Sequence, residues 1–192
     1  MPSLPTLEVV KKDPLLRFLL LGFSLFVGWL LLYYLVLHPH TMLDKAVIDS
    51  LIRWAGGILQ TFGYELLPEP DPDNYRTIGV QGGTPLWIGD PCNGVMVMAV
   101  YVIFIIAYPG LWKHRLWFAP LGLLVVHAIN AVRVSALSII VTYNYNWLTF
   151  NHDYTFYLVV YGCVFLLWWW WVKRFSDTVR ATSPEGSPNG TA

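Results

Sequence analysis

Long apolar runs divide the chain, and four of them approach the length that a bilayer-spanning helix needs. The runs cover residues 15–37, 91–111, 116–142 and 153–172, against roughly 20 residues for a helix that crosses an apolar layer of about 30 Å. The second run is long enough only if the turn Pro91 to Gly94 starts its helix. The pattern therefore predicts an all-α polytopic membrane protein with about four transmembrane helices.

The ends of these runs refine the prediction. The first run is too long for a signal peptide and no small-residue cleavage site follows it, so we expect it to remain as an anchor. The last run ends in Trp168 to Trp171, and such aromatic residues are typical of the lipid headgroup boundary. Residues 1–175 then form one transmembrane domain, and residues 176–192, whose end is rich in Ser, Thr, Pro and Gly, are predicted to be disordered.

The segment between the first two runs, residues 38–90, has its own pattern. Apolar residues recur at helical spacing from Leu43 to Phe62, and polar residues such as Asp44 and Arg53 fill the other face. This predicts an amphipathic helix, either lying in the membrane interface or packed on the end of the bundle. Farther along, residues 76–80 and 84–88 flank Gln81-Gly82-Gly83 and predict a small β-hairpin.

Positive charges indicate how the chain is oriented. In a four-span topology the near edge of the first run with the residues before it, the segment between the second and third runs, and the segment after the fourth lie on one side. They hold eight of the twelve Lys and Arg residues: Lys11, Lys12, Arg17, Lys113, Arg115, Lys173, Arg174 and Arg180. The positive-inside rule predicts a protein of the cell membrane with both termini cytoplasmic and the amphipathic segment outside.

The composition supports a membrane location and excludes several classes of protein. Apolar residues make up 56% of the chain and charged residues only 12%, about half the share usual in soluble domains. The net charge is zero, so we expect membrane lipids and no nucleic acid among its partners. Two cysteines cannot form a disulfide scaffold, and we predict neither a metal nor a cofactor.

Arg133 is the most unusual residue of the apolar runs. The free energy of inserting an arginine within a spanning helix is at least about 2.5–3.5 kcal/mol on insertion scales, so such residues are usually paired and functional. Counted from Leu116, Arg133 lies about 26 Å along the third helix, near its outer end, and Asn130 can share its face. Cys92 at the start of the second run and His152 before the fourth are expected at the same depth.

A thiol, an imidazole and a guanidinium at one depth are suited to cysteine catalysis. A thiolate is a nucleophile, and a neighbouring histidine can take its proton and later protonate a leaving amine. An arginine can stabilise the oxyanion of a tetrahedral intermediate. Cys92 at a helix N-terminus would also be favoured as a thiolate by the helix dipole.

Each of these residues also has a purely structural interpretation. Cys92 can be a buried small apolar residue, and Cys163, in the middle of the fourth run, suits packing. His152 can cap the fourth helix together with Asp153, and Arg133 can extend its guanidinium to the outer headgroups. His127, about 120° from Arg133 around the helix, is expected to bond a neighbouring helix.

The order of these motifs resembles that of the exosortase/archaeosortase family over roughly residues 85–172. The similar features are the turn Pro91-Cys92-Asn93-Gly94, the step Asn130-Ala131-Val132-Arg133, and the run His152-Asp153-Tyr154-Thr155-Phe156 followed by Val160-Tyr161-Gly162. One departure is Asn93, where family members often have a small residue. The chain is also shorter than the larger exosortases, as expected of a compact bacterial member.

The resemblance implies a multi-spanning cysteine transpeptidase. Its substrates would be exported proteins with a C-terminal motif, a transmembrane helix and a basic cluster, and its acceptor nucleophile is unknown. Cys92 would be the nucleophile, Arg133 the transition-state stabiliser and His152 the acid and base, on the extracytoplasmic side. Asn93, Asn130 and Asp153 would support these three residues.

Two other functions remain open. A haem-binding electron-transfer protein would use His127 and His152 as axial ligands, but His127 is expected well below the depth of His152. A small transporter or assembly factor would use Arg133 to bind an anionic ligand and would have no need of Cys92.

Overall fold

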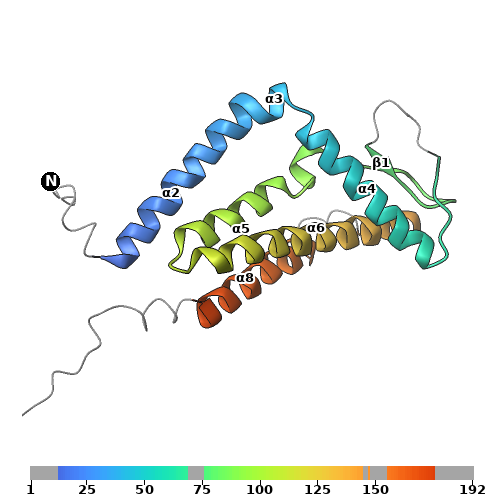
Figure 1. The fold of residues 1–192 in the computed structure, drawn as a ribbon. Helices are drawn as coiled ribbons and strands as arrows, with labels where there is room; N and C mark the ends of the chain where they lie inside the picture. Colours follow the sequence, from blue (N-terminus) through green and yellow to red (C-terminus); the bar gives the residue numbers. More distant parts are fainter. Residues whose placement is uncertain (1–12, 69–75, 145–146, 148–154, 176–192) are drawn as a thin grey trace, which may run out of the picture.

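The structure is a computed structural model that describes residues 13–68, 76–144, 147 and 155–175 (Figure 1). Helices dominate it, and a small antiparallel sheet lies at one end. In chain order the elements are α2 (Pro14–Leu32), η1 (Tyr33–Leu37, a π-helix), α3 (His38–His40), α4 (Leu43–Thr61), β1 (Thr77–Ile78), β2 (Leu86–Trp87), η2 (Asp90–Cys92, a 3₁₀ helix), α5 (Val95–Ala107), α6 (Trp112–Tyr143) and α8 (Phe156–Phe175).

Three helical stretches in the described residues are long and apolar enough to cross a membrane. They are Pro14–His40, Trp112–Tyr143 and Phe156–Phe175. The segment predicted as the second span is a shorter apolar helix, Val95–Ala107, whose 13 residues extend about 20 Å. The four-span prediction is therefore confirmed only as a helical membrane protein with three candidate spans and one shorter apolar helix.

The first long stretch begins at a defined cap. The Asp13 carboxylate accepts hydrogen bonds from the backbone N–H groups of Leu15 and Leu16, and Pro14 occupies the first turn, a position where its missing N–H is not needed. α2 buries none of its side chains and touches the bundle mainly through α5, for example where Phe18 meets Phe104 with ring centres 5.6 Å apart. Figure 1 shows α2 at the edge of the bundle, next to α5, with its far end at α3.

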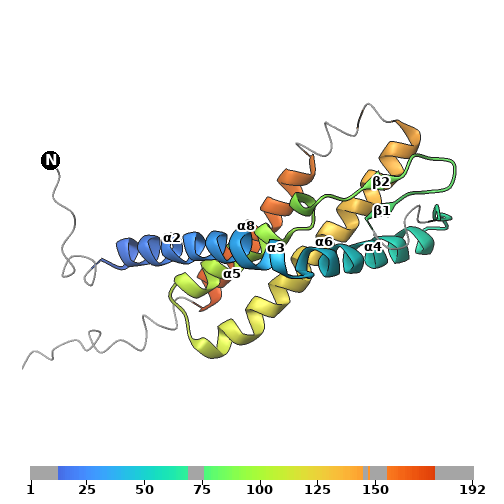
Figure 2. The ribbon, with the colours of Figure 1, turned by 90° about the horizontal axis from the view of Figure 1, so that it is seen from above.

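α4 packs against the half of α6 that ends at Tyr143 (Figure 2). Ile48, Leu51 and Leu59 are fully buried there, in one cluster with residues of the sheet and of α6. β1 and β2 pair with Thr77 opposite Trp87 and Ile78 opposite Leu86, which confirms the hairpin with shorter strands. Of the two positions left open for the amphipathic helix, the structure favours the packed one.

The polar face of α4 differs from the prediction at one residue. Asp44, expected among the exposed polar side chains, is only 5% exposed. The chain bends at Thr41 and Met42, between α3 and α4 (Figure 1), and this bend places the end of the first long helix beside the first turn of α4. Helical periodicity alone does not predict that contact.

The other half of α6 packs against α5 and α8 through aromatic side chains. Phe118, Tyr101 and Trp171 are fully buried in one cluster, and the Tyr101 hydroxyl donates to the Phe118 carbonyl over 2.8 Å. Gly122 leaves room for the Tyr101 ring, which a Cβ at this position would overlap. This half of the bundle is thus fixed by ring packing, and the site lies in the other half.

Candidate functional site

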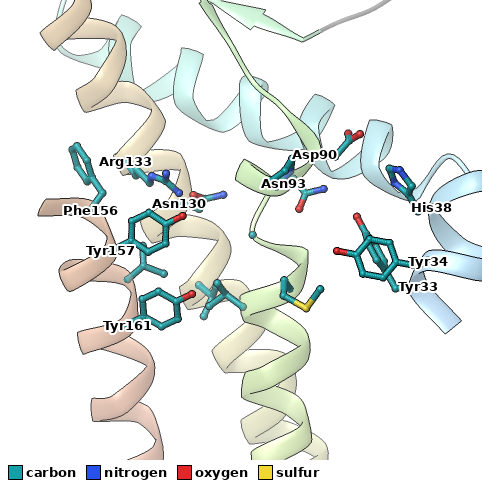
Figure 3. A pocket seen from close by; sticks show the side chains of 16 residues that line it. Tyr33, Tyr34, His38, Asp90, Asn93, Asn130, Arg133, Phe156, Tyr157 and Tyr161 are labelled. Atoms are coloured by element: carbon teal, nitrogen blue, oxygen red, sulfur yellow. The ribbon is translucent and has the colours of Figure 1, made fainter. Parts of the chain in front are cut away.

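A cavity of about 430 Å³ lies where the end of the first long helix, the start of α5, the middle of α6 and the start of α8 come together. Figure 3 shows two walls: Asn130 and Arg133 of α6 with aromatic side chains of α8 on one side, and His38, Asp90 and Asn93 on the other. The complete lining is Tyr33, Tyr34, His38, Asp90, Pro91, Asn93, Gly94, Met96, Val97, Val126, Asn130, Arg133, Phe156, Tyr157, Val160 and Tyr161.

Arg133 is half-buried, and its guanidinium is only partly satisfied. The guanidinium carbon lies 5.7 Å from the centre of the Tyr157 ring, a distance at which the ring attracts a cation. The buried Nε has no hydrogen-bond partner in the described part of the chain. An unpaired buried donor is destabilising by roughly 1–3 kcal/mol, so Arg133 is suited to bind a group that supplies an acceptor.

The turn that carries Cys92 is held by side chains on both of its flanks. Asn93 is 1% exposed, and its side-chain oxygen accepts from the backbone N–H of Val95, the first residue of α5, over 2.8 Å. Asn130 donates from Nδ2 to the Cys92 carbonyl over 3.1 Å. Gly94, which follows Asn93, has φ of +86°, a backbone conformation that is strained for residues with a side chain. The backbone around Cys92 is therefore fixed from α5 and from α6.

Cys92 and Arg133 both line a small recess of about 30 Å³. The remaining lining comes from the second strand segment and α6: Leu86, Trp87, Ile88, Val134 and Leu137. Cys92 does not line the larger cavity, which its neighbours Pro91 and Asn93 border. The structure thus brings Cys92 and Arg133 together, with Arg133 bordering both spaces.

The predicted helix start at Cys92 is wrong. Asp90–Cys92 forms a 3₁₀ turn and the α-helix begins at Val95, because the left-handed Gly94 interrupts the helical path. The helix-dipole argument for a thiolate at Cys92 therefore does not hold in the form in which the sequence suggested it.

Asp44 is a polar centre that the sequence did not indicate. Its Oδ1 accepts from the Tyr33 hydroxyl over 2.8 Å and from Asn93 Nδ2 over 2.6 Å. Its Oδ2 lies 2.9 Å from His38 Nδ1. Burial alone raises the pKa of this carboxyl, but the bonds from His38, Tyr33 and Asn93 outweigh it and hold the Asp44 pKa below its usual range.

An ion pair connects the hairpin to the same turn. Arg76, just before β1, donates from Nη1 to Asp90 Oδ1 over 2.6 Å. The Arg76 guanidinium carbon also lies 6.0 Å from the Trp87 ring centre. Asp90 lines the cavity, so the small sheet and the Cys92 turn are linked at its rim.

The other sequence candidates fall in three places. Asn93 and Asn130 lie in the site, as described above. His152 and Asp153 lie outside the described residues. His127 bonds Ser50 of α4, with Nε2 and Oγ 3.1 Å apart, as expected for a histidine that contacts a neighbouring helix, and Cys163 packs at the edge of the aromatic cluster.

The residues missed by sequence reasoning are Tyr33, His38 and Asp44. A carboxylate in the first turn of an amphipathic helix was the available signal, but helix periodicity placed it on the polar face. Within the described ranges, no group of three or more His, Cys, Asp or Glu residues is arranged to hold a metal ion. Comparison of the chain with protein-family models, curated proteins and solved structures gives no match.

Proposed function

We propose that this membrane protein is a cysteine transpeptidase that cleaves the C-terminal sorting signals of exported proteins. The observation that carries the proposal is the recess shared by Cys92 and Arg133. Acyl transfer through a thioester requires a nucleophile and, beside it, a fixed cation that stabilises the oxyanion. The resemblance of the ordered Cys92, Arg133 and His152 motifs to exosortases and archaeosortases supports the same chemistry.

The reaction would proceed in two steps. The Cys92 sulfur attacks a peptide carbonyl carbon, Arg133 stabilises the oxyanion that forms, and His152 gives a proton to the leaving amine. An acceptor nucleophile then attacks the thioester, the C–S bond breaks, and the Cys92 thiol is restored. Water is the acceptor by default, which makes the outcome hydrolysis.

The two spaces would have separate tasks in this reaction. Since Arg133 borders both the recess and the larger cavity, a substrate chain in the cavity can present its carbonyl to the recess beside the guanidinium. The hydrogen bonds of Asn93 and Asn130 would keep the Cys92 backbone in place during the attack. The distribution of Lys and Arg residues supports an extracytoplasmic position for the site, with both termini in the cytoplasm.

Mass spectrometry of protein C-termini tests the proposal. Source cells would carry the wild type, Cys92→Ala or Cys163→Ala as the only copy. We expect a set of exported proteins to end at new C-termini with the wild type and with Cys163→Ala, and to keep their terminal helix with Cys92→Ala. Cys163 is the matched control, because it is the other cysteine of the chain and lies at the aromatic cluster. Identical C-termini in all three strains would refute the proposal.

A second function, an anion-binding transporter or assembly factor, has one observation in its favour. The larger cavity is lined by Arg133, whose buried Nε lacks a partner in the described residues, but not by Cys92. In that case Cys92→Ser would be fully functional in cells while Arg133→Ala would lose function. The transpeptidase proposal requires both variants to fail.

A further inference from the structure

The His38 ring is held at one nitrogen and open at the other. Nδ1 lies 2.9 Å from Asp44 Oδ2, and Nε2 has no hydrogen-bond partner in the part of the chain that the structure describes. The imidazole lines the 430 Å³ cavity, and its side chain is 42% exposed. A carboxylate that accepts from Nδ1–H fixes the tautomer with its lone pair on Nε2, and that lone pair is free to take a proton.

Asp44 is built as an orienting group. Its side chain is 7% exposed, and burying a carboxylate is unfavourable unless several donors bond it. Tyr33 and Asn93 satisfy Oδ1, which leaves Oδ2 for His38. A carboxylate whose position is set by two donors and which in turn orients an imidazole is an arrangement suited to acid–base catalysis.

The same carboxylate brings His38 to the Cys92 turn. Asn93, which follows Cys92, and His38 bond the two oxygens of Asp44. Figure 3 shows His38, Asp90 and Asn93 on the cavity wall that faces Arg133 and Asn130. The charged and titratable groups around the imidazole are Asp44 of α4, Tyr33 and Tyr34 of the first long helix, Asp90 of the turn, and Arg133 across the cavity.

We propose that His38, oriented by Asp44, is the base that activates the acceptor in the second half of the reaction. This inference rests on the proposed function for its acyl-enzyme. The acceptor, for example water, loses a proton to His38 Nε2 while its oxygen bonds the acyl carbon. The C–S bond to Cys92 breaks, and the His38 proton passes to the departing sulfur. His152 then serves the leaving amine, and His38 serves the acceptor that arrives through the cavity.

The test separates the two half-reactions in the full chain, in lipid nanodiscs, with Cys163→Ser as background. Excess p-nitrophenyl acetate loads an acetyl group on Cys92, even if the thiol is poorly activated. Release of p-nitrophenolate reports loading, and peptide mass spectrometry reports loss of the acetyl group after the reagent is removed. The variants are His38→Asn, whose amide can replace the Nδ1–H donor to Asp44 but not Nε2, and His40→Asn. His40 is exposed on the same short helix, which makes it the matched control.

We expect His38→Asn to load at the wild-type rate and to lose the acetyl group about 10²-fold or more slowly, the scale of a general base. His40→Asn should match the wild type in both steps. The pH profile of acetyl loss should differ between the wild type and His38→Asn, because only the wild type carries the base. Added imidazole should raise the rate of His38→Asn by a larger factor than that of His40→Asn, which it would not do if His38 only supported the fold.

Different results refute the two proposals. If His38→Asn loses the acetyl group within twofold of the wild-type rate, with the same pH profile, His38 is a structural ligand of Asp44 and this inference is wrong. If Cys92 is loaded no faster in the wild type than in Arg133→Ala, which keeps Cys92, the proposed nucleophile site is wrong. The second result leaves the His38 measurement readable, because excess reagent loads the thiol in either case.

Discussion

The two halves of α6 are held in the bundle by different forces. Toward Trp112, α6 meets α5 and α8 through rings, and Phe118 lies 5.2 Å from Trp171 between ring centres. Toward Tyr143 it meets α4, the sheet and the Cys92 turn, where Asn130 and Ser135 are buried and bonded to backbone carbonyls of other elements. One half is a packed apolar core, and the other contains polar groups that must each find a partner.

This difference bears on how each half is held. In a bilayer, burial of apolar surface gives little driving force between helices, so close packing and hydrogen bonds hold them together. Both halves bury a donor without a partner in the described structure: Trp171 Nε1 in the aromatic half and Arg133 Nε in the polar half. In the polar half the arginine lines a cavity and a carboxylate is buried at Asp44, as expected where a site has to remain open to a ligand.

The largest effect that should separate the two halves is on the rate of acylation. Arg133→Lys keeps the charge but loses the planar donor group, and loss of one oxyanion donor lowers rates by about 10²–10³ in well-studied hydrolases. We expect a decrease of that order in Cys92 acylation by p-nitrophenyl acetate in nanodiscs, and a larger one for Arg133→Ala. The free energy of unfolding in mixed micelles should change little. A wild-type acylation rate for Arg133→Ala would show that the residue only anchors the helix or binds a ligand.

In the aromatic half, a substitution should lower the stability of the fold and leave the acylation rate unchanged. Gly122→Ala places a Cβ against the buried Tyr101 ring, and overpacking of this kind destabilises by about 1–3 kcal/mol. The control is Gly162→Ala in α8, where a Cβ meets nothing within 4 Å and where alanine favours the helix. Unfolding in mixed micelles should weaken only for Gly122→Ala, and the acylation rate per folded molecule should be unchanged. Equal stability of both variants would mean that this half repacks easily.

The smallest effect concerns the pH dependence of stability. Because the folded pKa of Asp44 is lowered, its carboxylate stabilises the fold at pH values above the unfolded pKa of about 3.9. That contribution is lost as the pH falls through the lower folded value. Unfolding measured from neutral to acid pH should show a smaller acid loss in Asp44→Asn than in the wild type. Parallel curves would show that Asp44 does not hold a stabilised charge.

Much of the helical architecture was predictable because it depends on local patterns. The hydropathy run 116–142 corresponds to Trp112–Tyr143, and the period of apolar residues gave the buried face of α4 at Ile48, Leu51 and Leu59. Gly82, with φ of +85°, allows the turn between the strands as its sequence suggested. These features require only a lipid or core environment on one side of the element.

The site was less predictable because its contacts join distant segments. Cys92 and Arg133 were expected together from their depth, and they do line one recess, but the recess is separate from the larger cavity. Neither Tyr33 nor His38 has a local signal for a bond to Asp44. Their meeting depends on the bend at residues 41–42 and on Asn93 arriving from another element. The catalytic roles of Cys92, Arg133 and His152 stay predictions.

The three bonds to Asp44 also decide whether the first long helix can be exchanged for another. A hydrophobic anchor of equal length would hold the chain in the membrane, yet it would remove Tyr33 and His38 and leave the buried carboxylate with Asn93 alone of its three bonding side chains. A chimaera that swaps α2 through α3 should therefore insert normally and still lose the shape of the cavity. In engineering terms, this helix is a component of the site, and a transplant must carry residues 33–44 with it.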